Sequence, residues 1–450
     1  MSSVVFNRKV QIDKGLIAVI AVALALRLLF LFVVSPTLTS DSRSYIYTAK
    51  TFISGSVPAE YESGRRRAPG YPLFLAAIYQ VSDENNFLVV SIQHLLGISV
   101  VWMVFYLCLI IFGSRWVALA ASLLAASDFY ILFYEHAVLS DFLQLFFLIS
   151  GIFTFALYIK EGKVAHLITA GIFAALLALT KDVFYLFPIV IIIAIFLYRG
   201  VKIPAWKGIA AYIISFLVIV SGWQAREYLT GDRIAKKPYL GRSLMVNAEF
   251  FLDYESPKYK DLKELFKKYE HLRYDHGGDY SFIELYVFNK YREQTGLLEA
   301  EIDRIYTGAA MEAIRHYPWK YAGRILYNIY IMYFPQSEYT MRSLDYVDGR
   351  GVKKHPEKVM ILKNTYRWIN KVLVLLFLAG LALSLFGEKD RAGRVLFIVL
   401  VMSICYSSIL SCMLNVGLVR YRVPIEPLIM MFSGMAVCRA AGMIAARVKR

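Results

Sequence analysis

LIAVIAVALALRLLFLFVVS, the stretch Leu16–Ser35, decides the fold of this chain. Its only charged residue is Arg27, and a helix of about 20 apolar residues spans a hydrocarbon core of about 30 Å. Similar apolar stretches recur at Phe87–Phe112, Val117–Phe133, Phe142–Ile159, Val164–Leu179, Val183–Tyr198, Gly208–Gly222, Tyr366–Phe386, Val395–Met413 and Ile425–Ala441. The sequence therefore predicts an all-α polytopic membrane protein with about ten transmembrane helices.

The overall composition supports a membrane environment. Of the 450 residues, 58% are hydrophobic and 19% are charged, more apolar surface than one soluble core requires. The net charge of +16 lies mostly beside the apolar stretches, and no separate basic segment with interleaved aromatic residues occurs. We therefore expect no nucleic-acid partner. The four cysteines lie in apolar stretches without metal-binding spacing, so no metal site is predicted from them.

The short loops predict the orientation. If both termini are cytoplasmic, the short loops rich in Lys and Arg lie inside, as the positive-inside rule requires. Two long polar segments, Pro36–Asn86 and Trp223–Lys363, then lie outside. The chain divides into a transmembrane module (1–222, with an outward loop at 36–86), an extracytoplasmic region (223–363) and C-terminal helices (364–450). No N-x-[ST] sequon occurs, which agrees with the plasma membrane of a prokaryote.

Helical periodicity is also present in the outward segments. Tyr45, Thr48, Ala49 and Phe52 recur on one side of a predicted surface helix from Asp41 to Ser54. Amphipathic patterns continue near Tyr259–Tyr269 and Ile302–Ala313. We interpret Tyr321–Pro335 as an interfacial helix rather than a span.

Two features of the first outward segment could carry chemistry. Asp41 stands just beyond the first span, where an ionisable group is a functional candidate, although Asp is also a favoured helix N-cap. Arg65, Arg66 and Arg67 precede a proline turn at Pro69. Arginine suits phosphate recognition, and the alternative is contact with lipid head groups.

Further candidates occur at other outward ends of spans. Glu135, His136 and Asp141 could bind a divalent cation, but their spacing matches no standard zinc pattern, and Ser140 or Asp141 could instead cap a helix. Lys181 could pair with Asp182 or bind an anion. The remaining charged candidates on this side are Arg226, Arg420, Arg422 and Glu426. We expect no required cofactor, with a divalent cation as the one candidate.

The order of these motifs resembles the GT-C superfamily of polytopic glycosyltransferases, within it the protein O-mannosyltransferases and the lipid A aminoarabinose transferase. The resemblance covers most of the chain and rests on Arg27 and Pro36, D-S-R-S-Y from Asp41, R-x-P-G-Y-P-L-F-L-A from Arg67, L-S-D ending at Asp141, L-T-K-D around Lys181, W-x-x-R-E-Y at Trp223 and R-Y-R-V-P-I-E-P from Arg420. It implies a GT-C-like bundle that transfers a sugar from a polyprenyl-phosphate donor to an acceptor hydroxyl, with inversion.

The resemblance also implies roles for individual residues. Asp41 and Asp141 map to the acids of the first and second outward loops, although the family's frequent Asp-Glu pair is Asp41-Ser42 here. Arg67 and Lys181 map to the basic residues that would hold the donor phosphate, and Arg420 and Arg422 are further candidates for that clamp. Asp41 would be the general base, with its pKa raised by partial desolvation. Tyr45, Glu135, His136, Arg226 and Glu426 are candidate acceptor-binding or supporting residues.

Two other functional classes stay open from the residues alone. A secondary transporter or flippase for a lipid-linked or anionic solute also carries intramembrane charges, but the chain has no duplicated halves. A non-enzymatic assembly protein would not need acids and bases on one face. The acceptor, whether lipid, glycan or protein, and the sugar are not specified by the sequence.

Overall fold

The computed structural model describes residues 13–55, 67–200, 203–229, 240–272, 280–335, 356–387 and 389–448. These residues form helices and contain no strand, only an isolated bridge between Thr37 and Ala137. The prediction of an all-α polytopic protein is confirmed. Eight helices are long and apolar enough to cross a membrane among the described residues, and a ninth span results if one bent helix pair is counted.

The helices of the N-terminal part follow the apolar stretches of the sequence. They are α1 (Lys14–Val33), α2 (Ser40–Ser54), α3 (Gly70–Ser82), α4 (Asn86–Phe112), α5 (Arg115–Ser127), α6 (Phe129–Glu135), α7 (Ser140–Glu161), α8 (Val164–Thr180), the 3₁₀ helix η2 (Asp182–Leu186), α9 (Pro188–Arg199) and α10 (Ile203–Leu229).

The C-terminal part begins with short helices and ends with long ones. It comprises α11 (Leu240–Ala248), η3 (Glu249–Phe251), α12 (Lys260–Lys268), α14 (Tyr280–Thr295), α15 (Glu299–His316), α16 (Pro318–Tyr333), α17 (Pro356–Leu385), α18 (Arg391–Leu414), the 3₁₀ helix η5 (Val419–Ile425) and α19 (Glu426–Val448). All ten predicted spans therefore lie on helices, and α8, with 17 residues, is shorter than the helices counted as spans above.

One predicted span is not straight. The stretch Val117–Phe133 breaks at Asp128 into α5 and α6, which meet at an angle of 52°. The carboxylate of Asp128 accepts a hydrogen bond of 2.8 Å from the backbone N–H of Ile131 and so caps α6. The break sets the direction of α6, which ends at Glu135, directly before His136.

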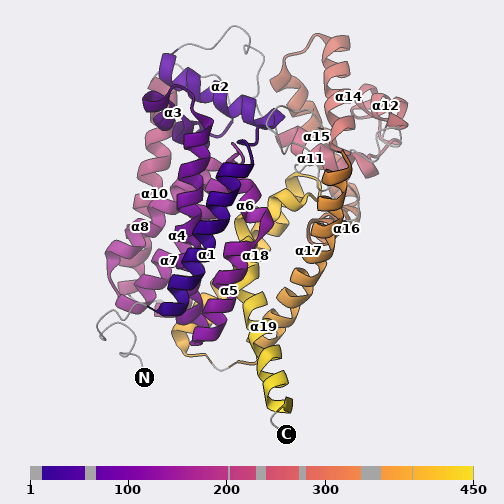
Figure 1. Cartoon of the computed structure of the whole chain (residues 1–450). Coiled ribbons are helices and arrows are strands. Elements are labelled where there is room, and N and C mark those ends of the chain that lie inside the picture. Colours follow the sequence, from indigo (N-terminus) through magenta and orange to yellow (C-terminus); the bar gives the residue numbers. More distant parts are fainter. Residues whose placement is uncertain are drawn as a thin grey trace.

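The polar segments gather at one end of the bundle. Figure 1 shows α2 and the group α11, α12, α14 and α15 at the end opposite to the start of α1 and the end of α19. Helices α11, α12, α14 and α15 build a second hydrophobic core, around Phe266, Ile302 and Tyr306, whereas Tyr45 and Ala49 of α2 belong to the main core of the bundle. The arrangement agrees with both long polar segments lying on one side of the membrane.

Helices are present where the amphipathic periodicity predicts them. Tyr45 and Ala49 of α2 are buried, and α2 packs against α3, so the periodicity near Asp41 is confirmed as the buried face of a helix. Helix α16 covers the stretch expected to be interfacial, and its exposed face carries Trp319, Leu326 and Tyr330. Exposed aromatic side chains suit the interface of a bilayer. The interfacial position of α16 stays a prediction.

Candidate active site

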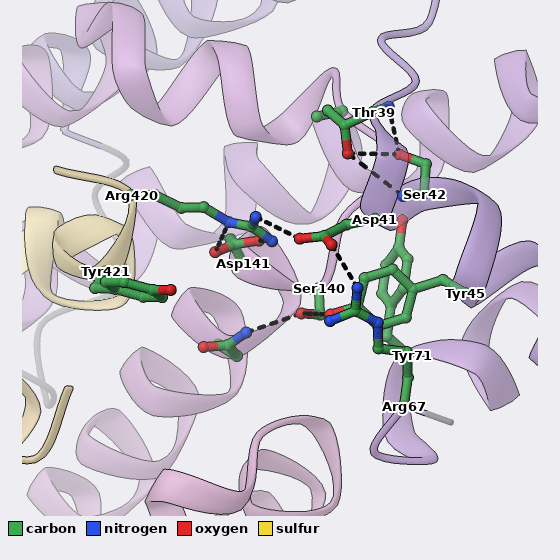
Figure 2. Close-up of polar contacts among 12 residues, drawn as sticks. Thr39, Asp41, Ser42, Tyr45, Arg67, Tyr71, Ser140, Asp141, Arg420 and Tyr421 are labelled. Atoms are coloured by element: carbon green, nitrogen blue, oxygen red, sulfur yellow. Dashed lines mark hydrogen bonds and ion pairs between the residues drawn. The ribbon is translucent and has the colours of Figure 1, made fainter. Parts of the chain in front are cut away.

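The candidate site begins at the first turn of α2. Thr39 is the N-cap of this helix, and its hydroxyl accepts a hydrogen bond of 3.3 Å from the backbone N–H of Ser42. The Ser42 hydroxyl in turn accepts one of 2.8 Å from the backbone N–H of Thr39, which completes a capping box. The alternative that Asp41 caps α2 is therefore wrong. Its carboxylate is free to point out of the first turn (Figure 2).

Two arginines hold the Asp41 carboxylate. Arg67 forms an ion pair with Oδ1 of Asp41, and Nη1 of Arg420 lies 2.7 Å from Oδ2. Nε of Arg67 also donates to the Ser44 hydroxyl at 2.6 Å. The α2 helix thus presents a carboxylate and a hydroxyl to one guanidinium. Arg65 and Arg66, the other members of the basic cluster, lie outside the described residues.

Arg420 joins the two predicted acids. Its Nε and Nη2 each lie 2.9 Å from one oxygen of Asp141, so the pair is bidentate, while Nη1 reaches Asp41. Figure 2 shows the guanidinium between the two carboxylates. A planar guanidinium has donors in the fixed geometry that such double contacts require. Asp141 does not cap α7, because the N-cap is Leu139 and makes no side-chain bond.

The neighbouring Ser140 is not a cap either. Its hydroxyl lies 2.8 Å from the Tyr45 hydroxyl and accepts a hydrogen bond of 3.0 Å from the Gln144 amide. Tyr45 also lies under the Arg67 guanidinium, with 5.0 Å between the guanidinium carbon and the ring centroid. Tyr45 therefore supports the site by linking α2 to α7.

Lys181 supplies the third cation. It ends α8, and its ammonium lies 5.8 Å from the centroid of Tyr421, the residue after Arg420. Among the described residues, no carboxylate lies within ion-pair distance of Lys181, so the expected pairing with Asp182 is not observed. Burial lowers the pKa of Lys181, and the positive charges of Arg420 and Arg67 lower it further. The negative charges of Asp141 and Asp41 act in the opposite direction, but the pKa stays below its usual value.

A close contact between α3 and α8 brings these cations to one place. A Cβ on Gly70, the first residue of α3, would lie 2.5 Å from the Thr180 hydroxyl and 2.8 Å from its backbone nitrogen. Only glycine fits there without movement of the backbone. The segment that carries Arg67 is thus held against the end of α8, next to Lys181.

The electrostatics of Asp41 differ from the expectation. Burial by itself raises the pKa of this carboxyl, but the positive charges of Arg420 and Arg67 outweigh burial and hold the pKa well below its usual range. The predicted upward shift is therefore wrong, because it considered desolvation without the two ion pairs. In this arrangement Asp41 is ionised at neutral pH but is a weak base.

Glu135 and His136 do not join this site. Glu135 is fully buried and bonds Nη2 of Arg27 at 2.6 Å and Nδ1 of His94 at 2.8 Å. His94 continues to Nδ1 of His136 at 3.0 Å, and Nε2 of His136 reaches the Val34 carbonyl at 2.9 Å. Their polar atoms are engaged in this buried chain of hydrogen bonds, so the structure does not bring them together with Asp141 around a cation. Their expected role toward an acceptor stays a prediction.

The buried chain instead positions the segment that leads to Asp141. It connects the C-terminal half of α1 and the N-terminal half of α4 to residues 135–137, and Gln93 adds hydrogen bonds to the carbonyls of Glu135 and Ala137. Burial and the adjacent His94 lower the pKa of His136 to about 4. His136 is therefore neutral near pH 7. A Cβ on Gly97 would lie 2.1 Å from the Glu135 carboxylate, so only glycine at this position leaves space for the Glu135 side chain.

A second buried cluster holds the segment of Arg420. Arg422 is 1% exposed, lies 2.7 Å from the Glu426 carboxylate and donates to Asn370, whose amide bonds the Tyr333 carbonyl at 2.8 Å. Arg422 is thus engaged away from Asp41 and Asp141, and its expected contact with the donor phosphate stays a prediction. Arg422 and Glu426 fix η5 against α16 and α17, and so support Arg420 from behind.

Arg226 has a comparable supporting position. Its guanidinium stacks on Phe52 and Trp223, at 5.4 Å and 5.0 Å from the ring centroids, and so links the end of α10 to α2.

Among the described residues, no group of three His, Cys, Asp or Glu side chains could hold a metal ion. The polar residues of the buried chain that sequence reasoning did not select, Gln93 and His94, are adjacent polar residues in an otherwise apolar span, a signal that could have identified them.

Comparison with known proteins supports the predicted resemblance. Residues 66–223 match the sequence model of the dolichyl-phosphate-mannose-protein mannosyltransferase family, and no curated protein matches the chain. The matched segment covers about a third of the chain. It contains Arg67, Asp141 and Lys181 and excludes Asp41 and Arg420.

Solved structures give further similarities. The archaeal oligosaccharyltransferase AglB from Archaeoglobus fulgidus, in complex with an inhibitory peptide and a dolichol-phosphate, is 11% identical with a TM-score of 0.48 over 97% of this chain and 51% of its own. This chain thus spans about half of that protein. ArnT from Cupriavidus metallidurans, bound to undecaprenyl phosphate, is 12% identical with a TM-score of 0.40 over 94% of this chain and 78% of its own. The family match over residues 66–223 confirms the resemblance to membrane glycosyltransferases that the sequence predicts.

Proposed function

We propose that this protein transfers a sugar from a polyprenyl-phosphate donor to an acceptor hydroxyl on the outer face of the membrane, with inversion. The observation that carries the proposal is the cluster of Arg67, Lys181 and Arg420 around Asp41 and Asp141. These residues come from separate segments and are packed at the polar end of the bundle. Among these five described side chains, three cations face two carboxylates, so their summed charge of +1 favours a phosphate.

The chemistry requires cations and a proton acceptor. The acceptor oxygen forms a bond to the anomeric carbon, and its proton goes to Asp41. The bond between that carbon and the phosphate oxygen breaks, and its electron pair stays on the departing polyprenyl phosphate. The phosphate gains negative charge in this step, so cations placed around it stabilise the transition state more than the ground state. Asp141 acts by fixing Arg420 through two hydrogen bonds.

The proposed clamp is tested by donor binding. Arg67→Ala and Lys181→Ala should each weaken binding of a polyprenyl-phosphate sugar by about 1.5 to 3 kcal/mol, since each removes one charge-assisted contact to phosphate. This corresponds to about ten- to hundredfold in Kd, measurable by titration of purified protein. Arg43→Ala removes an exposed arginine from the same helix as Asp41 and is the matched control. Parental affinity in the first two variants would show that the clamp is assigned to the wrong residues.

The outward position of the site is tested by labelling. A cysteine at Glu255, an exposed residue between η3 and α12, should react with a membrane-impermeant maleimide in intact cells. The motivation is the positive-inside pattern, together with the placement of α2 and α11–α15 opposite the start of α1 and the end of α19 (Figure 1). The parent chain gives the background from its own cysteines. Labelling that requires broken membranes would reverse the orientation.

A further inference from the structure

Both oxygens of the Asp41 carboxylate form ion pairs with arginines that we propose bind the donor phosphate. Oδ1 pairs with Arg67 and Oδ2 with Arg420, and Arg420 is also bidentate to Asp141. The Asp41 side chain is 28% exposed and those of both arginines are below 20% exposed, so the pairs are well shielded from solvent. An ion pair in such a site is stronger than one at the surface.

The surroundings of Asp41 offer the arginines no other anion within the described part of the chain except Asp141. Ser44 and Tyr45 on α2 are neutral partners of Arg67, and Lys181 from the end of α8 is a further cation. A phosphate that enters beside Lys181 therefore meets two guanidinium groups that already bind carboxylates. A phosphate that takes over the nitrogen atoms that now face Asp41, Nη2 of Arg67 or Nη1 of Arg420, replaces a contact to Asp41.

We propose that the donor phosphate and Asp41 compete for Arg67 and Arg420, so that donor binding is the event that releases Asp41 to act as the base. The inference rests on the proposed function and adds an order of events to it. Without donor, the two ion pairs keep Asp41 a weak proton acceptor. When phosphate takes over one or both guanidinium groups, the carboxylate regains its proton affinity next to the anomeric carbon. The acceptor hydroxyl is therefore activated only after the donor has bound.

The competition has a consequence that a simple base does not share. Removing the charge of Asp41 should strengthen binding of the phosphate, because Arg67 and Arg420 then need not break an ion pair with Asp41 to bind it. We expect Asp41→Asn to bind undecaprenyl phosphate about tenfold more tightly than the parent, measured by native mass spectrometry of the purified full-length protein in detergent. Asn keeps the size of the side chain, and Thr39 and Ser42 keep the helix cap.

The matched control is Asp83→Asn. Asp83 is an exposed acid at the end of α3 with φ of 44°, a left-handed conformation that Asn adopts readily. This variant removes the same charge away from the cluster, so its affinity should stay within about twofold of the parent. Asp41→Ala is a second variant of the site, and thermal unfolding of each variant checks that the fold is kept.

The outcomes separate the two proposals. Tighter binding in both Asp41 variants and unchanged binding in Asp83→Asn supports the competition. Unchanged or weaker binding in folded Asp41 variants overturns the competition and leaves the proposed function standing. If neither the parent nor any variant binds undecaprenyl phosphate, the donor assignment fails, and the inference fails with it.

Discussion

Asp41→Asn is expected to lower the rate of sugar transfer by about a hundredfold or more, because it removes the proton acceptor and keeps size and hydrogen bonding. The measurement is transfer from a polyprenyl-phosphate sugar in membranes or detergent, with protein insertion checked. A helix cap would predict survival of activity, since Asn caps about as well as Asp. The cap of α2 is Thr39, however, so a loss of activity in this variant is attributable to the carboxylate.

The Asp41 variant carries a second, independent readout. Loss of transfer together with tighter binding of the carrier phosphate is the combination that proton acceptance and competition require. An Asp41→Asn protein that inserts correctly and transfers sugar near the parental rate would remove Asp41 from the mechanism. Asp141 would then be the remaining acid of the cluster, because Glu135 is buried against Arg27 and His94.

Arg420→Lys is expected to cause a loss of similar size, about a hundredfold in kcat/KM. The guanidinium makes three contacts, two to Asp141 and one to Asp41, and a lysine ammonium has no planar fork to reproduce them. The substitution keeps the positive charge, so it tests the geometry rather than the net charge of the site. Loss of one preorganised donor to a developing anion typically costs 10²- to 10³-fold in rate.

The control for Arg420→Lys is Arg43→Lys, the same exchange at an exposed position of α2. Its activity should remain near that of the parent. Thermal unfolding distinguishes a local effect from a loss of the η5 segment, which is held separately by Arg422 and Glu426. Near-parental transfer by a folded Arg420→Lys protein would show that the bridge between the two acids is not needed for catalysis.

The positions of the helices could be predicted from the sequence because the hydropathy of a segment depends only on its own residues. Each apolar stretch must satisfy its backbone polar groups within itself in a bilayer, and a helix does so. The ten predicted spans therefore coincide with helices, and the buried face of α2 follows from the spacing of Tyr45 and Ala49. The break at Asp128 was missed because a single cap residue in an apolar stretch does not disturb its mean hydropathy.

The sequence alone determined a bundle of membrane helices and the set of charged residues near the ends of these helices. Tertiary structure decided which of these residues meet. Arg420 and Arg422 are two positions apart, yet one bridges Asp41 and Asp141 while the other pairs with Glu426. In a 3₁₀ helix, with three residues per turn, residues two apart point to different sides, and the tertiary structure decides which of these sides faces Asp41 and Asp141. The direction of the Asp41 pKa shift was fixed in the same way, because it depends on an arginine 379 positions away in the chain.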